Sequence, residues 1–478
     1  MSSVISLPLS IIYTRCLGEG TVPPDWKYAN VTPIFKKGFK GSAGNYRPVS
    51  LTCVLCKVME SIIRDAIVEH LDMYNLLRSS QHGFLSGRSC LTNLLEYLEE
   101  LTRLVDEGHS VDVVYLDFAK AFDKVPHSRL VKKWEGLGIR GDISGWIAEW
   151  LKDRKQRVVL NGHASQWEEV LSGVPQGSVL GPTLFLIYIN DIDEASSTAG
   201  AVIKKFADDT KCSMVVENEE DKVKFQDLLD NLSEWSKEWQ MLFNTDKCHV
   251  VHIGRRNPQY EYNWGTGKLE VSEEEKDVGV IVSKTLKPSL QCARAAKKAN
   301  QVLGQMSRAV TYRDKYTFCR LYKVYVRHHL QYCSPAWSPY TAADKELLEN
   351  FQRRAVRMMS NLSGTYEQKL ERLGLYTLEV NRERGDMIEV FKIITGKSKE
   401  DYQTWFELAP VREGALNTRV STGYLQLVEP KLKNLDIRRN FFTNRCPSMW
   451  NNLPDHIKMS TTVDTFKAAY DAHLKIVK

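Results

Sequence analysis

The stretch VDVVYLDF, residues 111–118, decides how this chain folds. It is a continuous apolar run of the kind that predicts a buried β-strand. The run carries an acid, Asp117, at its end. Because a buried carboxylate without a partner is costly, Asp117 is expected to meet a cation or a hydrogen-bonding group.

Two further acids stand side by side in AVIKKFADDTKCSMVV, residues 201–216, which predicts two strands around an Asp208-Asp209 turn. Adjacent carboxylates repel each other, and a divalent cation relieves that repulsion; hard oxygen ligands favour Mg²⁺ or Mn²⁺. If this hairpin neighbours the first strand, three carboxylates converge as two-metal phosphoryl transfer requires. The alternative is a polar turn that binds nothing.

A third stretch, SGVPQGSVLGPTLF at residues 172–185, places glycines and prolines before the start of an apolar helix. Gly173 and Gly177 let the backbone approach a ligand closely, and Gln176 offers both a hydrogen-bond donor and an acceptor. These properties suit a pocket against a nucleotide base or a template strand. A purely structural loop that leads into a helix is the alternative.

The remaining periodicities predict a mixed α+β protein. Ser89 and Gly108 are expected to bound one of the helices as its N-cap and its C-terminal stop. Helices are predicted near 51–76, 89–107, 126–138, 142–153 and 221–241 and over most of the chain beyond 288, with strands and loops at 20–50, a hairpin at 155–171 around Asn161-Gly162, and strands at 247–253 and 277–283.

Charge is unevenly distributed along the 478 residues, although 65 Lys+Arg and 59 Asp+Glu leave a net charge of only +6. Residues 217–278 hold 8 basic and 15 acidic residues, whereas residues 284–360 hold 15 basic and 4 acidic ones. A basic helical segment interleaved with tyrosines suits a nucleic-acid backbone. The alternative is a solvated basic face with its aromatic residues in a core.

Composition excludes several classes of protein. An apolar fraction of 43% and a charged fraction of 26% exclude extensive disorder, and ten scattered cysteines exclude a disulfide scaffold. No pattern of a zinc site, signal peptide or membrane span is recognised. The sequence predicts an intracellular protein that is not secreted and has no membrane partner.

The three stretches, in this order and spacing, resemble motifs A, B and C of reverse transcriptases, in the non-LTR (LINE-type, jockey-like) retrotransposon subtype. The strings that carry the resemblance are YLDFAKAFDKVPH (115–127), SGVPQGSVLGPTLF (172–185) and KFADDT (205–210). Further strings resemble the fingers, motifs D and E, the thumb and the C-terminal segments: 33–51, QHGFLSGRSCLTNLL (81–95), LFNTDKCHVVHIG (242–254), 276–289, 325–340, 347–359 and 439–454.

The resemblance implies a role for each matching residue. Asp117, Asp208 and Asp209 match the catalytic acids, which with the Phe118 carbonyl would bind two Mg²⁺ ions, or Mn²⁺ in their place. Lys247 matches the motif D lysine, a candidate proton donor to pyrophosphate. The substrate-binding matches are Phe122 under the sugar, Gln176 and Gly177 beside the nucleotide and template, and Arg88 and Arg47 near the triphosphate; Asp123 is expected to be structural.

The resemblance also implies a right-hand polymerase and its partners. The expected parts are an N-terminal segment (1–19), fingers (20–110), a palm with an antiparallel sheet (111–282), a helical basic thumb (283–365) and a C-terminal extension (366–478). The expected activity is RNA-directed DNA synthesis from an RNA template, a DNA primer and dNTPs, in the nucleus and/or the cytoplasm. The alternative is an idle, truncated retroelement remnant that only binds nucleic acid. The upstream endonuclease of complete elements is expected to be missing.

Overall fold

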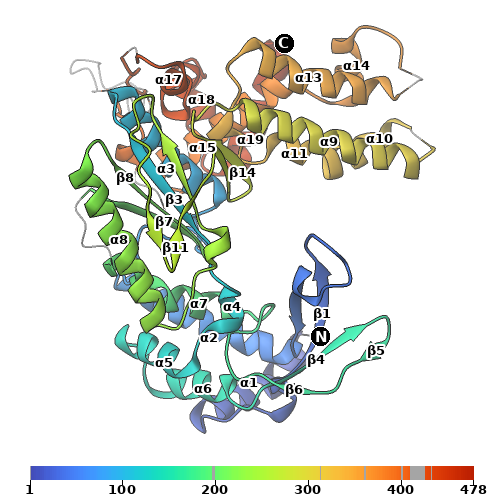
Figure 1. The fold of residues 1–478 in the computed structure, drawn as a ribbon. Helices are drawn as coiled ribbons and strands as arrows, with labels where there is room; N and C mark the ends of the chain where they lie inside the picture. The colour runs from blue at the N-terminus through green and yellow to red at the C-terminus, as the bar shows by residue number, and fades with distance from the viewer. Residues whose placement is uncertain are drawn as a thin grey trace, which may run out of the picture.

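A five-stranded sheet forms the middle of the molecule (Figure 1), in a computed structural model that describes residues 2–195, 200–312, 314–359, 362–399, 402–409, 426–431 and 433–477. Its central strand is β3 (Val111–Leu116), which pairs antiparallel with β8 (Asp209–Val215) on one side and with β9 (His249–Ile253) on the other. The outer strands are β7 (Val202–Phe206) and β12 (Glu270–Val271). The predicted strand at 111–118 and the hairpin at 201–216 are confirmed as neighbours in one sheet.

The sheet separates two hydrophobic cores, because successive side chains of a strand point to opposite faces. Val111 and Val113 join a core with α3 (Cys90–Glu107) and the C-terminal helices. Val114 and Leu116 join a second core, formed with α1 (Ser2–Gly18), α2 (Val54–Met73), α5 (His127–Gly136), α6 (Gly141–Leu151), α7 (Gly181–Tyr188) and α8 (Glu219–Glu238).

The predicted ends of α3 are confirmed. The Ser89 hydroxyl accepts a hydrogen bond from the Thr92 amide at 3.2 Å, and Gly108 ends the helix at φ +98°. The helices expected at 51–76, 126–138, 142–153 and 221–241 are confirmed as α2, α5, α6 and α8. The helix α1 is not among the predicted elements, since its apolar residues do not follow a single face and Pro8 lies inside it.

A second sheet extends from the lower part of the molecule (Figure 1), below the C-terminal helices. It is built from β1 (Tyr28–Phe35), β2 (Tyr46–Leu51), β4 (Lys155–Leu160), β5 (His163–Ala164) and β6 (Glu168–Glu169). The hairpin predicted around Asn161-Gly162 is confirmed, with φ values of +50° and +83°. Its first strand, β4, also pairs in parallel with β1, which lies more than a hundred residues earlier in the chain.

The strand predicted at 277–283 is instead a hairpin. It consists of β13 (Glu274–Asp277) and β14 (Val280–Ser283), and Val278 and Gly279 form the turn at positive φ. The residues before the turn, 274–277, are charged, and only those after it are apolar, so the sequence shows the pattern of one strand where the structure has two. The smaller elements of this region are β10 (Asn263–Trp264) and β11 (Gly267–Lys268), a two-stranded sheet.

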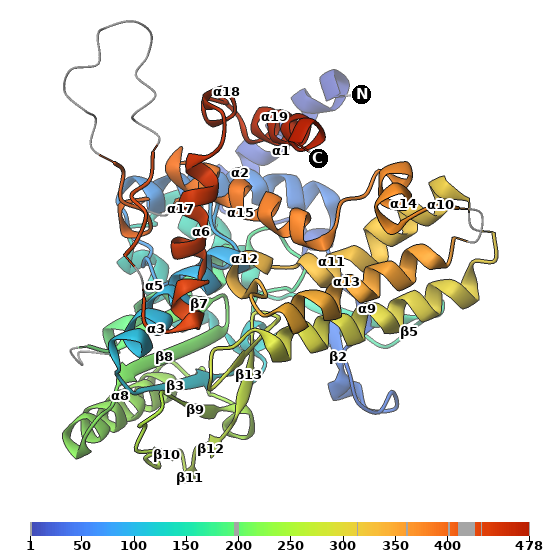
Figure 2. The ribbon, with the colours of Figure 1, turned by 90° about the horizontal axis from the view of Figure 1, so that it is seen from above.

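Most of the described chain beyond residue 288 is helical, as predicted. One group of helices projects to one side of the central sheet (Figure 1): α9 (Ser289–Ala309), α10 (Lys315–Leu321), the π-helix η5 (Tyr322–Val326), α11 (Arg327–Gln331), α13 (Ala342–Arg357) and α14 (Tyr366–Leu373). The short helix α12 (Ser334–Trp337) packs against α3 and α15. A second group includes α15 (Leu378–Ile394), α16 (Asp436–Arg439), α17 (Phe442–Asn451), α18 (Asp455–Lys458) and α19 (Val463–Val477), and α17 lies beside α3 (Figure 2).

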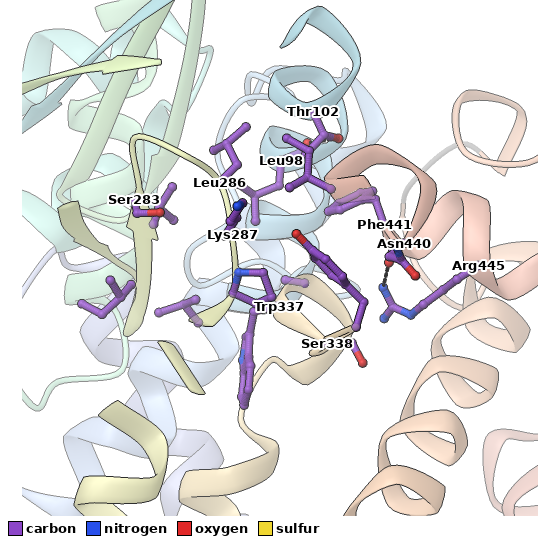
Figure 3. Close-up of a pocket in the computed structure, with 17 residues that line it drawn as sticks. Leu98, Thr102, Ser283, Leu286, Lys287, Trp337, Ser338, Asn440, Phe441 and Arg445 are labelled. Carbon is purple, nitrogen blue, oxygen red and sulfur yellow. Dashed lines mark hydrogen bonds between the residues drawn. The ribbon is translucent and has the colours of Figure 1, made fainter. Parts of the chain in front are cut away.

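A small pocket of about 40 Å³ lies where α3, β14, α12 and α17 come together (Figure 3). Leu98, Trp337 and Phe441 line it, and Arg445 donates a hydrogen bond to the Asn440 carbonyl beside it at 3.0 Å. The pocket is too small for a nucleotide and contains none of the predicted site residues. Among the described helices, none has the length and apolar character that crossing a bilayer requires.

Candidate active site

Strand register brings the three predicted catalytic acids to one edge of the central sheet. Leu116, the last residue of β3, pairs with Thr210, so Asp117, the next residue, faces Asp209 at the start of β8. Phe206 pairs with Asp209, which leaves Ala207 and Asp208 as the two residues of the turn. The predicted Asp-Asp turn is therefore corrected in one detail: Asp208 lies at the tip, whereas Asp209 is the first residue of a strand.

The three carboxylates affect one another electrostatically. Loss of surrounding water raises the pKa of Asp208, and the charge of Asp117 raises it further. The same two causes, together with Asp208 and Asp277, raise the pKa of Asp209 to about 6. An edge of the sheet that holds this much uncompensated negative charge favours a cation.

A lysine already partly balances this charge. Tyr115 pairs with His249, so the same register sets Lys247 opposite Asp117, and the Lys247 ammonium forms an ion pair with the Asp117 carboxylate. Lys247 belongs to the short helix η4 (Thr245–Lys247) rather than to the strand predicted at 247–253. The site thus brings together the four residues predicted to be catalytic.

The donor atoms at this edge fit a hard divalent cation, since they are carboxylate oxygens. Among the described residues, no three His, Cys, Asp or Glu side chains are gathered tightly enough to hold a metal ion as they stand. The Asp117 carboxylate instead contacts Lys247. The Phe118 ring stacks on Phe243 at 4.3 Å, which anchors the residue whose carbonyl was predicted as a further ligand.

Phe122 lies five residues after Asp117, in the short helix α4 (Ala121–Lys124). Its ring stacks on Phe185 of α7 at 4.5 Å and meets the edge of Phe84 at 6.1 Å. Phe84 is 57% exposed and at φ +56°. Sequence reasoning missed Phe84 as a member of the site, although the string QHGF around it was noted for its resemblance to the fingers.

The loop that carries Gln176 and Gly177 is held on both sides. The side-chain amide of Gln176 donates to the Asp123 carboxylate at 2.9 Å, and the backbone amide of Ser50 donates to the backbone carbonyl of Gln176 at 2.7 Å. Gly177 has φ +115°, and a Cβ there would lie 2.5 Å from the Ser50 carbonyl oxygen. The loop therefore passes against β2, and Asp123 has the structural role expected of it.

The two predicted arginines differ in their surroundings. Arg47, on β2, carries a charge that lowers the pKa of Asp208, so it lies within electrostatic reach of the acids. Arg88 instead donates to the backbone carbonyls of Ser79 and Gln81, the latter at 2.7 Å. In this structure Arg88 braces the loop that precedes α3.

A buried ion pair lies two residues from Asp209. Lys211 and Asp277 have side chains only 4% and 5% exposed, and their charged groups are in contact. The Lys211 ammonium also donates to Asn93 of α3 at 2.9 Å and lies over the Tyr97 ring at 4.3 Å. The pair joins the central sheet to the hairpin β13–β14 and to α3.

The central sheet with an acidic edge, a second sheet and the projecting helices together define a right-hand polymerase, as expected. Residues 34–304 match the family described as reverse transcriptase (RNA-dependent DNA polymerase). These residues are more than half of the chain, and the chain belongs to this family.

Individual relatives come from mobile elements. The chain is 28% identical to the probable RNA-directed DNA polymerase from transposon X-element of Drosophila melanogaster over 262 residues, which cover 54% of this chain and 29% of that protein. It is 26% identical to the RNA-directed DNA polymerase from mobile element jockey of Drosophila funebris over 374 residues, 75% of this chain and 40% of that protein. Apo telomerase from Candida tropicalis superposes with a TM-score of 0.40 and 12% identity, covering 77% of this chain and 74% of that chain.

These matches confirm the resemblance to jockey-like polymerases of non-LTR retrotransposons. The chain spans less than half the length of the curated polymerases it matches. The absence of an upstream endonuclease and the domain boundaries stay predictions.

Proposed function

We propose that this chain is an RNA-directed DNA polymerase that extends the 3′-hydroxyl of a DNA primer on an RNA template with dNTPs. The observation that carries the proposal is the register of β3, β7 and β8, which sets Asp117, Asp208 and Asp209 at one edge of the sheet. In this proposal residues 20–110 are the fingers, 111–282 the palm, 283–365 the thumb and 366–478 a C-terminal extension, and the chain works inside the cell.

Asp117, Asp208 and Asp209 would hold two Mg²⁺ ions, which supply charge stabilisation for the attacking hydroxyl and the departing pyrophosphate. The contribution of the chain is to position these carboxylates at one edge of a rigid sheet and to concentrate negative charge where the cations bind. The raised pKa of Asp208 and Asp209 supports this assignment, because burial and the neighbouring carboxylates both disfavour the charged form and a bound cation offsets both effects.

Lys247 is proposed as the proton donor to pyrophosphate. Its ammonium already lies at the acidic edge, in contact with Asp117, and its side chain is 55% exposed. Lys247 would leave Asp117 when a cation takes over that carboxylate, and its three N–H donors would then be available to a phosphate oxygen.

The nucleotide is proposed to lie between the acidic edge and the fingers. Phe122 would support the sugar, and its stack on Phe185 fixes the ring for this role. Arg47 is the better placed of the two arginines to contact the triphosphate, since its charge reaches Asp208. Gln176 and Gly177 would line the template side, and Arg88 would act through the loop that it braces.

The proposed thumb is suited to hold the nucleic-acid duplex. Its exposed basic residues include Arg294, Lys297, Lys298, Lys315, Arg320 and Lys323. Tyr312 and Tyr316 are 75% and 70% exposed and so are available for stacking, whereas Tyr322 and Trp337 are buried in the core. The sequence left two interpretations of this segment, a nucleic-acid-binding face with tyrosines and a solvated basic face with its aromatic residues in a core. Tyr312 and Tyr316 agree with the first, and Tyr322 and Trp337 agree with the second.

Primer extension on an RNA template with Mg²⁺ and dNTPs tests the proposal. Asp208→Ala is expected to abolish extension, and Asp227→Ala, at an exposed acid on α8, is the matched control that keeps it. Extension that survives Asp208→Ala contradicts the assignment. Salt-dependent binding of RNA by the unaltered chain without any extension would identify a nucleic-acid-binding remnant instead.

A further inference from the structure

A loop of the fingers lies directly against the turn that carries Asp208. The Lys205 amide donates to the Ser80 carbonyl at 2.8 Å, and the His82 amide donates to the Lys205 carbonyl at 2.9 Å. Gln81 thereby forms a parallel bridge with Lys205, the residue before the last of β7. The edge strand of the catalytic hairpin is thus extended by a segment that lies more than a hundred residues earlier in the chain.

The Gln81 side chain joins this loop to the turn. It is 2% exposed. Its Oε1 atom accepts hydrogen bonds from the Ala207 amide at 2.8 Å and from the Gly83 amide at 2.7 Å, and its Nε2 atom lies 3.4 Å from the Ala207 carbonyl oxygen. One carboxamide therefore contacts both backbone polar groups of the residue that precedes Asp208.

Two features of the turn require such a contact. Ala207 has φ +55°, a left-handed conformation that a residue with a side chain adopts only when its surroundings hold it there. Gly83 packs so closely that a Cβ on it would lie 2.3 Å from the Ala207 nitrogen. The loop and the turn fit together only with glycine at this position.

We propose that Gln81 is a positioning residue for the divalent-cation site, an inference that rests on the proposed polymerase function. Gln81 satisfies the buried amides of Ala207 and Gly83 and so fixes the direction in which Asp208 leaves the turn. Without its Oε1 atom the Ala207 amide loses its partner, and a buried unpaired N–H is costly. Rotation of the turn toward water relieves that cost and carries Asp208 away from Asp117.

Binding of Mn²⁺ alone to the full chain, followed by electron paramagnetic resonance, tests the proposal without requiring activity. Gln81→Met keeps the length of the side chain and removes both polar atoms. It is expected to weaken Mn²⁺ binding by about 10–100-fold, the usual effect of losing a partner that orients metal ligands. Gln81→Asn, which remains polar but is one methylene shorter, serves as a second variant if Gln81→Met does not fold.

Gln352→Met is the matched control. Gln352 is a glutamine that is 0% exposed, and it bonds to the Tyr322 hydroxyl at 2.8 Å within the proposed thumb. Its loss is expected to lower the melting temperature while leaving the Mn²⁺ affinity unchanged. A melting temperature alone therefore does not separate Gln81 from any other buried glutamine, whereas the metal affinity does.

The outcomes separate this inference from the proposed function. Mn²⁺ binding that depends on Asp208 and is weakened by Gln81→Met supports the positioning role, even if the unaltered chain fails to extend primers. Unchanged Mn²⁺ affinity in folded Gln81→Met or Gln81→Asn overturns it, even if the unaltered chain is an active polymerase. Mn²⁺ binding that does not depend on Asp208 overturns it as well, because there is then no site for Gln81 to shape.

Discussion

The buried pair of Lys211 and Asp277 allows a quantitative prediction for Asp277→Asn. Both side chains are at most 5% exposed, so little water is available to solvate the ammonium once the carboxylate is gone. Lys211 would keep neutral partners, the Asn93 amide oxygen at 2.9 Å and the Tyr97 ring at 4.3 Å, and would lose the carboxylate in contact with its ammonium. Breaking a buried pair from one side in this way costs about 3–5 kcal/mol, and we expect the free energy of unfolding to fall by that amount.

Equilibrium unfolding in urea, followed by tryptophan fluorescence, measures this loss. The double variant Lys211→Met with Asp277→Leu removes both charges, and it is expected to lose much less than Asp277→Asn, since an apolar pair can replace a buried ion pair at about zero net cost. A loss below about 1 kcal/mol for Asp277→Asn would refute the reasoning. A double variant that is as unstable as Asp277→Asn would show that the charge itself is not the cause.

Three further predictions concern the acidic edge, the Gln176 loop and the thumb. The folded-state pKa of Asp209 is raised from 3.8 to about 6, so its charge increasingly destabilises the folded state as the pH rises through that range. The melting temperature of Asp209→Asn should therefore exceed that of the unaltered chain at pH 7. The two melting curves should coincide at pH 4. Gly177→Ala should lower the free energy of unfolding in the same urea titration, because Gly177 has φ +115° and lies against β2. Gly145→Ala is the control: Gly145 lies in α6 with open space around it, and alanine there should raise the free energy of unfolding by about 0.5–1 kcal/mol. Lys297→Gln should reduce the slope of log affinity for an RNA–DNA duplex against log salt concentration by about 1, as measured by fluorescence anisotropy. Lys237→Gln, on the acidic helix α8, is the control and should leave that slope unchanged.

The sequence allowed much of the site to be predicted because its signals are local. The apolar run that becomes β3, the cap at Ser89 and the paired acids at 208 and 209 each lie within a few residues. A two-residue turn and the pleat of the strands then suffice to place Asp117 opposite Asp209.

The features that could not be predicted depend on contacts between distant segments. The parallel pairing of β1 with β4 has no local signal. The turn at Val278 and Gly279 stands at the start of an apolar run, directly after the charged residues 274–277, and so does not separate two apolar strands in the sequence. Arg88 carries a positive charge that suits a phosphate, yet its guanidinium donates to carbonyls of its own loop, a choice that only the folded backbone reveals.

Because alternate residues of β3 belong to different cores, neither half of the molecule can lose its packing without exposing one side of that strand. The opening of β3 is therefore coupled to the unfolding of both halves, and its backbone amides should be among the slowest in the chain to exchange with deuterium. Elements that lie away from this strand, such as the helices of the proposed thumb and the outer strands of the second sheet, are expected to open at lower free energies. Asp117 therefore follows a strand that is expected to be among the last to open, whereas elements far from that strand are free to move.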